Sequence, residues 1–144
     1  MGMKINMDVA KLKEQLRATA DELGRATRPA AQAGAQIIYL QARLNCPESE
    51  SAHMFHGTNA VYGPYSPGNL RNSIYQAFSK DNSFKDVSTY HVSWNADKAP
   101  YGAMVEFGTS RAAAQSFIAR SIKETRSEVR AAIKARFIEE VNRK

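Results

Sequence analysis

The chain of 144 residues has only one cysteine, Cys46, so it cannot form an internal disulfide bond. Small secreted domains often depend on such bonds, so this composition indicates synthesis in a reducing, cytosol-like compartment. No apolar run approaches the ~20 residues that a membrane-spanning helix needs. The first residues, MGMKINMDVA, also lack the apolar core of about 7–15 residues of a signal peptide. We therefore expect a soluble protein without a membrane partner.

Metal-ligating side chains are few. Of the 3 histidines, His53 and His56 stand close together in the sequence. Zinc takes three or four ligands, and the nearby candidates are Cys46 with Glu48 or Glu50. Two histidines in a polar segment are usually unrelated to metal binding. The sequence therefore predicts no metal and no other cofactor.

Catalytic motifs are absent as well. The sequence contains no Gly-x-Ser-x-Gly elbow, no Walker loop and no dinucleotide-binding glycine pattern. Cys46 with His91 remains a remote alternative as a thiol-hydrolase pair, although a position after a helix C-terminus disfavours the thiolate. Glu106 has no second acid near it in the sequence with which to divide the acid and base roles. The sequence therefore predicts that the protein is not an enzyme.

Positive charge is concentrated at the two ends of the chain. The net charge is +6, with +3 over 1–44 (7 basic, 4 acidic), −2 over 45–110 (4 basic, 6 acidic) and +5 over 111–144 (9 basic, 4 acidic). Near the C-terminus, a group of basic side chains falls within an arc of ~120° at ~100° per residue. This basic stripe consists of Arg120, Lys123, Arg126, Arg130 and Lys134. The sequence leaves open whether this stripe faces DNA, a neighbouring subunit or solvent.

Apolar residues recur at helical spacing near the N-terminus. Their first stripe consists of Val9, Leu12, Leu16, Ala20 and Leu23. Asp8 is a suitable N-cap, and a similar stripe resumes after Pro29. Because proline interrupts a helix, residues 8–45 are predicted to form two helices or one helix kinked at Pro29. A short edge strand is predicted at Lys4–Met7.

The middle of the chain is predicted to contain a loop and a small sheet. Residues 48–69 are rich in glycine, proline and serine, so we expect a long loop, whose aromatic residues predict docking on another surface. Residues 70–95 are predicted to form an antiparallel β-hairpin. Its strands are expected at Ser73–Phe78 and Val87–Trp94, with a turn at Asp81–Ser83.

Two helices are predicted to follow. Tyr101–Phe107 is expected to be a short helix, and residues 115–142 a long one. The last turns of the long helix carry apolar residues on more than one face, which indicates a partner surface. The sequence thus predicts a single α+β domain, 1–144, in which an N-terminal helix or kinked helix pair and a long C-terminal helix pack on a small antiparallel β-sheet.

A series of motifs carries a resemblance to a known family. PGNLRNSI at 67–74 is followed by YGAMVEFGT at 101–109 and by AQSFI at 114–118. In this order they resemble the tailed-phage neck and tail-completion proteins, typified by gene product ten of the HK-type lambdoid phages. The resemblance covers residues 8 to 140. Within it, Asn-Cys-Pro stands where the family has Ala-Pro, the segment 48–69 is longer, and Ser116 replaces a proline.

The resemblance implies a structural morphogenesis protein of a tailed bacteriophage or prophage. Such a protein forms a ring at the neck and joins head and tail or completes the tail. Its partners would be further copies of itself, as a hexamer or dodecamer, and neighbouring neck or tail-tube proteins, with non-specific contact to DNA in the lumen. It would be made in the host cytoplasm and reside at the head–tail junction of the virion. The alternative is a small basic nucleic-acid-binding protein that uses the C-terminal helix.

The positions that match the family motif are expected to define fold and assembly. They are Gly68, Leu70, Arg71, Ser73, Ile74, Tyr101, Glu106, Phe107, Gly108, Thr109 and Phe117. Glycine at position 68 is expected to permit a sharp turn before Leu70 enters the core. Arg71 is expected to pair with Glu106, which is the nearest acid among the motifs.

The second motif is predicted to form and end the short helix. Tyr101 and Phe107 are expected to be core anchors. Gly108 suits a left-handed residue that stops the helix, and Thr109 is expected to bond the backbone groups freed there.

Overall fold

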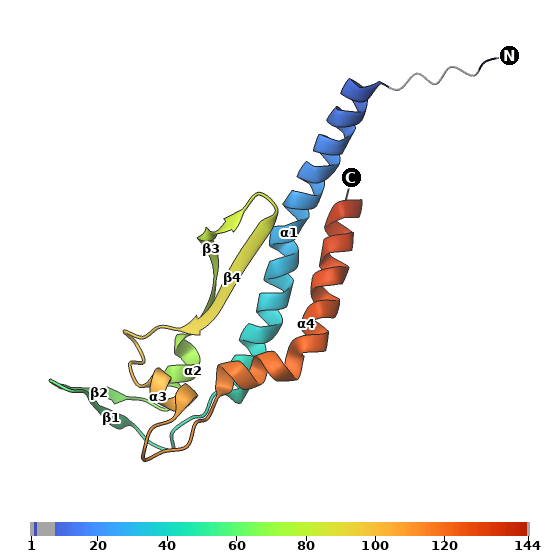
Figure 1. Cartoon of the computed structure of the whole chain (residues 1–144). Helices are drawn as coiled ribbons and strands as arrows, with labels where there is room; N and C mark the ends of the chain where they lie inside the picture. Colours follow the sequence, from blue (N-terminus) through green and yellow to red (C-terminus); the bar gives the residue numbers. More distant parts are fainter. Residues whose placement is uncertain (1, 3–7, 144) are drawn as a thin grey trace.

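The structure is a computed structural model that describes residues 2 and 8–143, so the strand predicted at Lys4–Met7 lies outside the described residues. The elements in order are α1 (Val9–Asn45), β1 (His53–His56), β2 (Val61–Tyr65), α2 (Asn69–Ser73), β3 (Ile74–Phe84), β4 (Val87–Trp94), α3 (Gly102–Phe107) and α4 (Phe117–Asn142). The two long helices lie side by side and antiparallel, and the β3–β4 hairpin lies along α1 (Figure 1). The short elements gather where α1 ends and α4 begins.

Helix α1 is one helix of 37 residues that continues through Pro29, so the alternative of two separate helices is wrong. Its start is capped as predicted, because Asp8 Oδ1 accepts a hydrogen bond of 3.1 Å from Lys11 N. Proline inside a helix costs about 3 kcal/mol. Small buried residues on both sides of the proline let neighbouring elements pack closely, which offsets this cost. They are Ala26, Ala30, Gly34, Ala35 and Ala42.

Strands β3 and β4 form the predicted antiparallel hairpin, with Ile74 opposite Trp94 at its base. The turn lies at residues 85–86, so the prediction of a turn at Asp81–Ser83 is wrong. Those three residues belong to β3, in the stretch where the register with β4 shifts. Their turn-forming side chains bond locally within the irregular pairing instead of reversing the chain.

The tip of this hairpin is attached to α1. Lys85 Nζ lies 2.6 Å from Asp21 Oδ1, and the hydroxyls of Thr27 and Ser88 are 2.9 Å apart. The ion pair lowers the pKa of Asp21, chiefly through the hydrogen bond from Lys85. Gly24 faces the turn, where a Cβ would come within 3.0 Å of the Lys85 carbonyl oxygen. Glycine suits this position because the turn between β3 and β4 approaches α1 so closely.

The hairpin predicted over 70–95 begins four residues later than expected, because Asn69–Ser73 form the short helix α2. Gly68, with φ of +81°, turns the chain into this helix as predicted. Ser73 is buried, and its hydroxyl donates 2.7 Å to the carbonyl oxygen of Asn69. This bond satisfies the buried hydroxyl within the last turn of α2, where the sequence had predicted the start of a strand.

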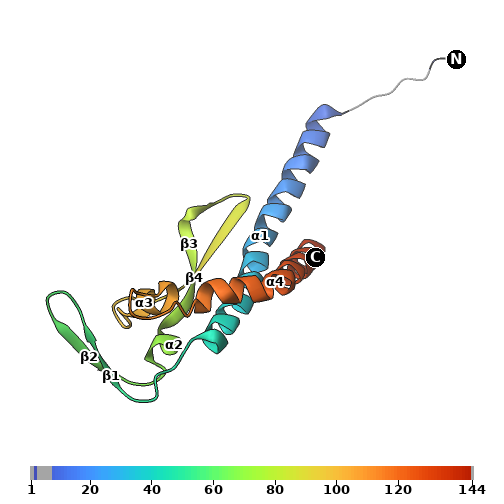
Figure 2. The ribbon, with the colours of Figure 1, turned by 60° about the horizontal axis from the view of Figure 1, so that its bottom comes forward.

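The long loop predicted at 48–69 is wrong, because this segment contains a second antiparallel hairpin, β1–β2. Phe55 lies opposite Tyr62, and His53 lies opposite Tyr65. Glycine and proline in and between these short strands are typical of loops, so the sequence did not indicate strands here. The hairpin reaches away from the helices in Figure 2. Its base docks on the chain itself, since the rings of His53 and Tyr65 lie 4.7 and 5.1 Å from that of Tyr101.

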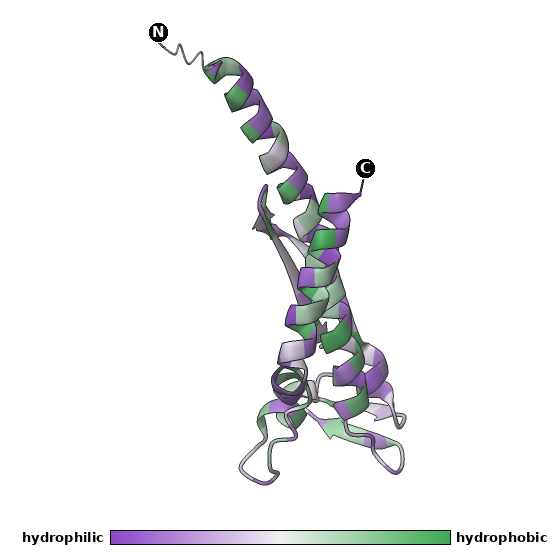
Figure 3. Cartoon of the chain, turned by 90° about the vertical axis from the view of Figure 1, so that its right-hand side faces the viewer, coloured by the Kyte–Doolittle hydropathy of each residue, from purple (hydrophilic) through white to green (hydrophobic). Residues whose placement is uncertain are grey.

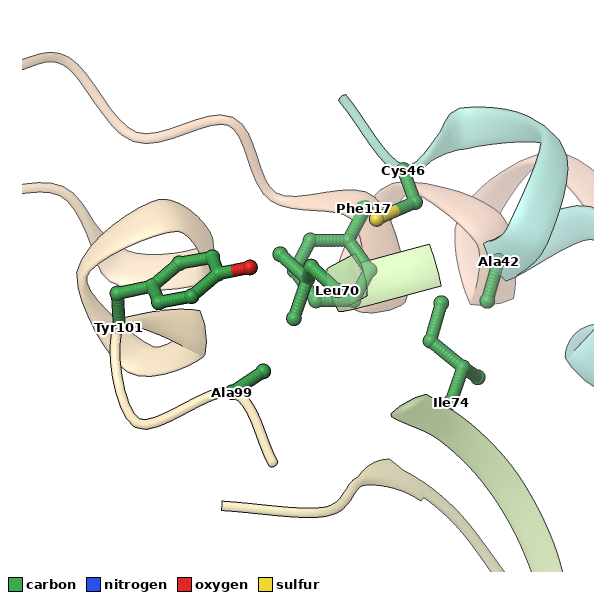
Figure 4. Packing of buried hydrophobic residues seen from close by; sticks show 7 residues of the cluster. All are labelled: Ala42, Cys46, Leu70, Ile74, Ala99, Tyr101 and Phe117. Atoms are coloured by element: carbon green, nitrogen blue, oxygen red, sulfur yellow. The ribbon is translucent and has the colours of Figure 1, made fainter. Parts of the chain in front are cut away.

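The apolar core lies at the end of the molecule where all the short elements meet (Figure 4). It draws one or two residues from each surrounding segment. Its members are Ala42, Cys46, Leu70, Ile74, Ala99, Tyr101 and Phe117. The predicted α+β class is confirmed, with two small antiparallel sheets and a C-terminal helix packed with the long N-terminal one.

Candidate functional site

The carboxylate of Glu106 joins α3 to the start of α4. Its two oxygens accept hydrogen bonds of 3.0 Å each from the backbone N–H groups of Ile118 and Ala119. These are amides of the first turn of α4, which have no partner within the helix. Ser116 Oγ donates 2.9 Å to the carbonyl oxygen of Glu106. Because Glu106 is only 4% exposed, this motif acid acts as a buried cap that fixes the direction of α4.

The predicted pairing of Arg71 with Glu106 is therefore wrong. Arg71 Nη1 lies 3.0 Å from Glu48 Oε2, in the segment between α1 and β1. Both side chains are partly exposed, which makes the ion pair weak in energy. It spans Gly68, where a Cβ would come within 3.1 Å of Arg71 Nη2. Arginine and glycine of the first motif thus lie together at the turn before α2.

Of the two expected core anchors, Tyr101 is buried and Phe107 is not. Tyr101 is 9% exposed, and its hydroxyl accepts a hydrogen bond of 3.0 Å from Asn69 Nδ2. Burial raises the pKa of Tyr101. Phe107 is 76% exposed at the end of α3, so its assignment to the core is wrong. The short helix directs Glu106 inward, and the next residue consequently points to solvent.

The end of α3 differs in detail from the prediction. Gly108 has φ of +77° and ψ of 175°, so its φ is positive as expected, but the residue is not left-handed helical. Its N–H donates 2.9 Å to the carbonyl oxygen of Met104. Thr109 Oγ1 accepts from the N–H groups of Arg111 and Ala112, so it closes the following turn and does not bond the end of α3.

The remaining motif positions support the core. Leu70 and Ile74 are each 4% exposed, and Phe117 is fully buried against Trp94, with ring centroids 5.8 Å apart. Gly102 of the second motif lies against the Trp94 indole so closely that an added Cβ would overlap its nitrogen. The three motifs therefore meet around one tryptophan and one phenylalanine, a cluster that periodicity alone does not reveal.

The structure does not bring Cys46 and His91 together. Cys46 is buried in the core, and its Sγ donates to the carbonyl oxygen of Pro47 over 3.6 Å. His91 is exposed on β4, where it lines a groove that β4 forms with α1 and α4. Burial raises the pKa of the Cys46 thiol from 9.0 to about 11, which keeps it protonated at neutral pH.

We predict slow alkylation of Cys46 in the folded protein. At pH 8 its thiolate fraction is about 100-fold lower than that of a thiol of ordinary pKa, since the two values differ by about two units. Labelling of Cys46 by iodoacetamide, followed by mass spectrometry, is expected to be at least about 100-fold slower in the native chain than in urea. Equal labelling rates in the two states would contradict the burial of Cys46.

The raised pKa of Cys46 also stabilises the fold below pH 9.0, and this contribution is lost as the pH rises through about 11.

The two neighbouring histidines lie on opposite faces of β1. Burial alternates along β1, with His53 half-buried and His56 exposed, as expected for residues on opposite faces of a strand. Over residues 2 and 8–143, no group of three or more His, Cys, Asp or Glu side chains is placed to hold a metal ion.

The basic stripe lies on the solvent-exposed side of α4. The side chain of Arg120 makes two contacts within the chain. Its Nε lies 3.6 Å from Glu124 Oε1, and its Nη2 donates a hydrogen bond of 3.2 Å to the carbonyl oxygen of Asn45. The other four members are exposed, and none of them forms an ion pair within the part of the chain that the structure describes. They are Lys123, Arg126, Arg130 and Lys134.

No family model matches the chain, and no curated protein and no solved structure is similar to it at a significant level. None of the helices formed by the described residues is long and apolar enough to cross a bilayer.

Proposed function

We propose that the protein is a structural morphogenesis subunit of a tailed bacteriophage or prophage, which forms a ring at the neck of the virion and joins head and tail or completes the tail. Its partners are further copies of the chain, in a hexamer or dodecamer, and adjoining neck or tail-tube proteins. This role requires no catalytic group, only surfaces that assemble in order. The proposal rests on the resemblance of the three motifs and on one feature of the surface.

That feature is the apolar stripe near the start of α1. Figure 3 shows apolar and polar residues alternating along the part of α1 that extends past the end of α4. The large side chains of this stripe are between 40% and 61% exposed. They are Val9, Leu12, Leu16 and Leu23. A helix gains most of its stability by packing its apolar face, so this segment supports the proposal of contact with a neighbouring subunit.

Further apolar side chains are exposed at the two ends of the β3–β4 hairpin. Phe84 and Val87 lie at its tip, with Phe84 74% exposed. Met104 and Phe107 lie on α3, near its base. A protein that joins two different assemblies needs a contact surface for each, and these separated patches fit that requirement.

The experiment that tests the proposal is the absolute mass of the purified chain, measured by light scattering on a sizing column at low and high salt. A ring held by apolar contacts is expected to have a mass that is a multiple of 16.0 kDa and that does not fall with salt. Incubation of a monomeric chain with purified phage tails or heads tests assembly on a template. A chain that stays monomeric and binds neither particle would overturn the proposal.

We predict that Leu12→Glu with Leu16→Glu abolishes assembly. The charged side chains replace the exposed stripe, whereas glutamate keeps the helix propensity of leucine, so the isolated fold is expected to be retained. The matched control is Ala18→Glu, which adds charge at an exposed position on the opposite side of α1. The control is expected to assemble like the unaltered chain in the same light-scattering measurement. Assembly of the double variant would show that the stripe is not a subunit contact.

A further inference from the structure

Helix α4 carries a row of four exposed cations: Lys123, Arg126, Arg130 and Lys134. They are three or four residues apart, so they follow one side of the helix. The residues of α4 that are fully buried, such as Ser121 and Thr125, lie on its other side. The row therefore faces away from the packed interior of the chain.

The acids of α4 do not neutralise this row. Glu139 and Glu140 lie 3.1 and 2.8 Å from the guanidinium of Arg136, outside the row. Glu124 lies beside Arg120. Glu128 is at least about 120° around the helix from every member of the row, at ~100° per residue. Among residues 8–143, these four positive charges thus have no ion-pair partner along one exposed edge.

The spacing of the row fits a phosphate backbone. A rise of 1.5 Å per residue separates successive cations by roughly 4.5–6 Å and gives the row a length of about 16 Å. One strand of duplex DNA carries a negative charge for every ~3.4 Å of axis, so the row spans about five phosphates. The residues beside the row, Ser127 and Ala131, are small and exposed, so a wide backbone can approach the helix.

We propose that these four side chains bind the phosphate backbone of duplex DNA without reading its bases. The proposed contacts are with phosphates alone, which carry no sequence information, so the binding is expected to be independent of sequence. The inference concerns the exposed face of a single chain and does not depend on whether the chain forms a ring. A contact with a neighbouring copy of the chain is the competing role that the experiment separates.

The test is fluorescence anisotropy of the full chain with a labelled 20-base-pair duplex of arbitrary sequence, over a series of salt concentrations. Four phosphate contacts predict a slope of about −3.6 in log affinity against log salt, or about 150-fold weaker binding at 200 mM than at 50 mM. Each single change to glutamine in the row is expected to reduce the slope by about 0.9. The fourfold glutamine variant is expected to lose measurable binding, and Arg120→Gln, the matched control, to keep the slope of the unaltered chain.

The mass of the fourfold variant distinguishes this proposal from ring formation. An unchanged mass with lost DNA binding supports the assignment of the row to DNA, whether that mass is of a monomer or a ring. A slope that the four substitutions leave unchanged would overturn the inference. A fall in mass together with lost binding would overturn it too, because the row would then be a contact between subunits. Circular dichroism of each variant verifies that α4 is intact.

Discussion

The variant Glu106→Ala is expected to lower the free energy of unfolding by about 2–4 kcal/mol. Its carboxylate satisfies two backbone amides at the start of α4, and hydrogen bonds to a charged group contribute about 1.5–3 kcal/mol each in favourable cases. Loss of a helix cap alone costs about 0.5–2 kcal/mol. Alanine leaves those amides without a side-chain partner beside a position that is only 4% exposed. Urea unfolding followed by circular dichroism measures the change.

The matched control for this prediction is Glu106→Gln. Glutamine keeps the shape of the side chain and one acceptor oxygen, so it is expected to lose about half as much stability as alanine does. If the capping interaction is the role of this motif acid, the order of stability is glutamate, then glutamine, then alanine. Equal stability of all three chains would contradict the cap.

The variant Phe117→Ala is expected to cost about 3–5 kcal/mol, the range for a large aromatic removed from a core. Phe117 is fully buried, and it fills the space between Trp94 and the other residues of the core. Truncation at this position leaves a cavity where α1, α2 and α4 meet. Thermal and urea unfolding of the purified variant measure the loss.

Phe107→Ala provides the comparison, because it removes the same side chain from a position that is 76% exposed. Its effect on stability is expected to stay within about 0.5 kcal/mol, as for surface substitutions in general. A cost similar to that of Phe117→Ala would mean that Phe107 is packed after all. The pair therefore tests which phenylalanine of the two motifs belongs to the core.

The long helices and strand β4 were predictable because their signals are local. Amphipathic spacing and the Asp8 cap placed α1, and β-branched and aromatic residues placed β4 at its observed bounds, Val87–Trp94. The choice between two helices and one helix through Pro29, the two alternatives that the sequence left open, was not predictable, because it depends on packing by residues far away in the sequence. The single helix is a tertiary effect that overrides a local preference.

The hairpin β1–β2 was missed because its strands are only four and five residues long and include Gly63 and Pro64. Such residues normally mark loops, and here the strands are held by aromatic packing on Tyr101, about forty positions further along the chain. Packing between distant segments leaves no periodic signal in a single sequence.

The partner of Glu106 was missed for a different reason. Among the charged side chains, Arg71 was the expected partner, whereas the actual partners of Glu106 are backbone amides. Every residue except proline carries such an amide, so sequence cannot single out the right pair. The one available signal was the start of a predicted helix about ten residues after a motif acid, where unsatisfied amides attract carboxylates.

Helix α4, which packs against α1 and brings Phe117 into the core, is the last element along the described chain. During synthesis at ~5–20 residues per second, α1 leaves the ribosome several seconds before its main partner does. The core stays open throughout this interval, with the small residues that α1 buries in the folded chain, such as Ala35 and Ala42, in contact with water. Folding is thus completed only after α4 has been made, and a premature stop within α4 would release a helix whose packing partner is missing.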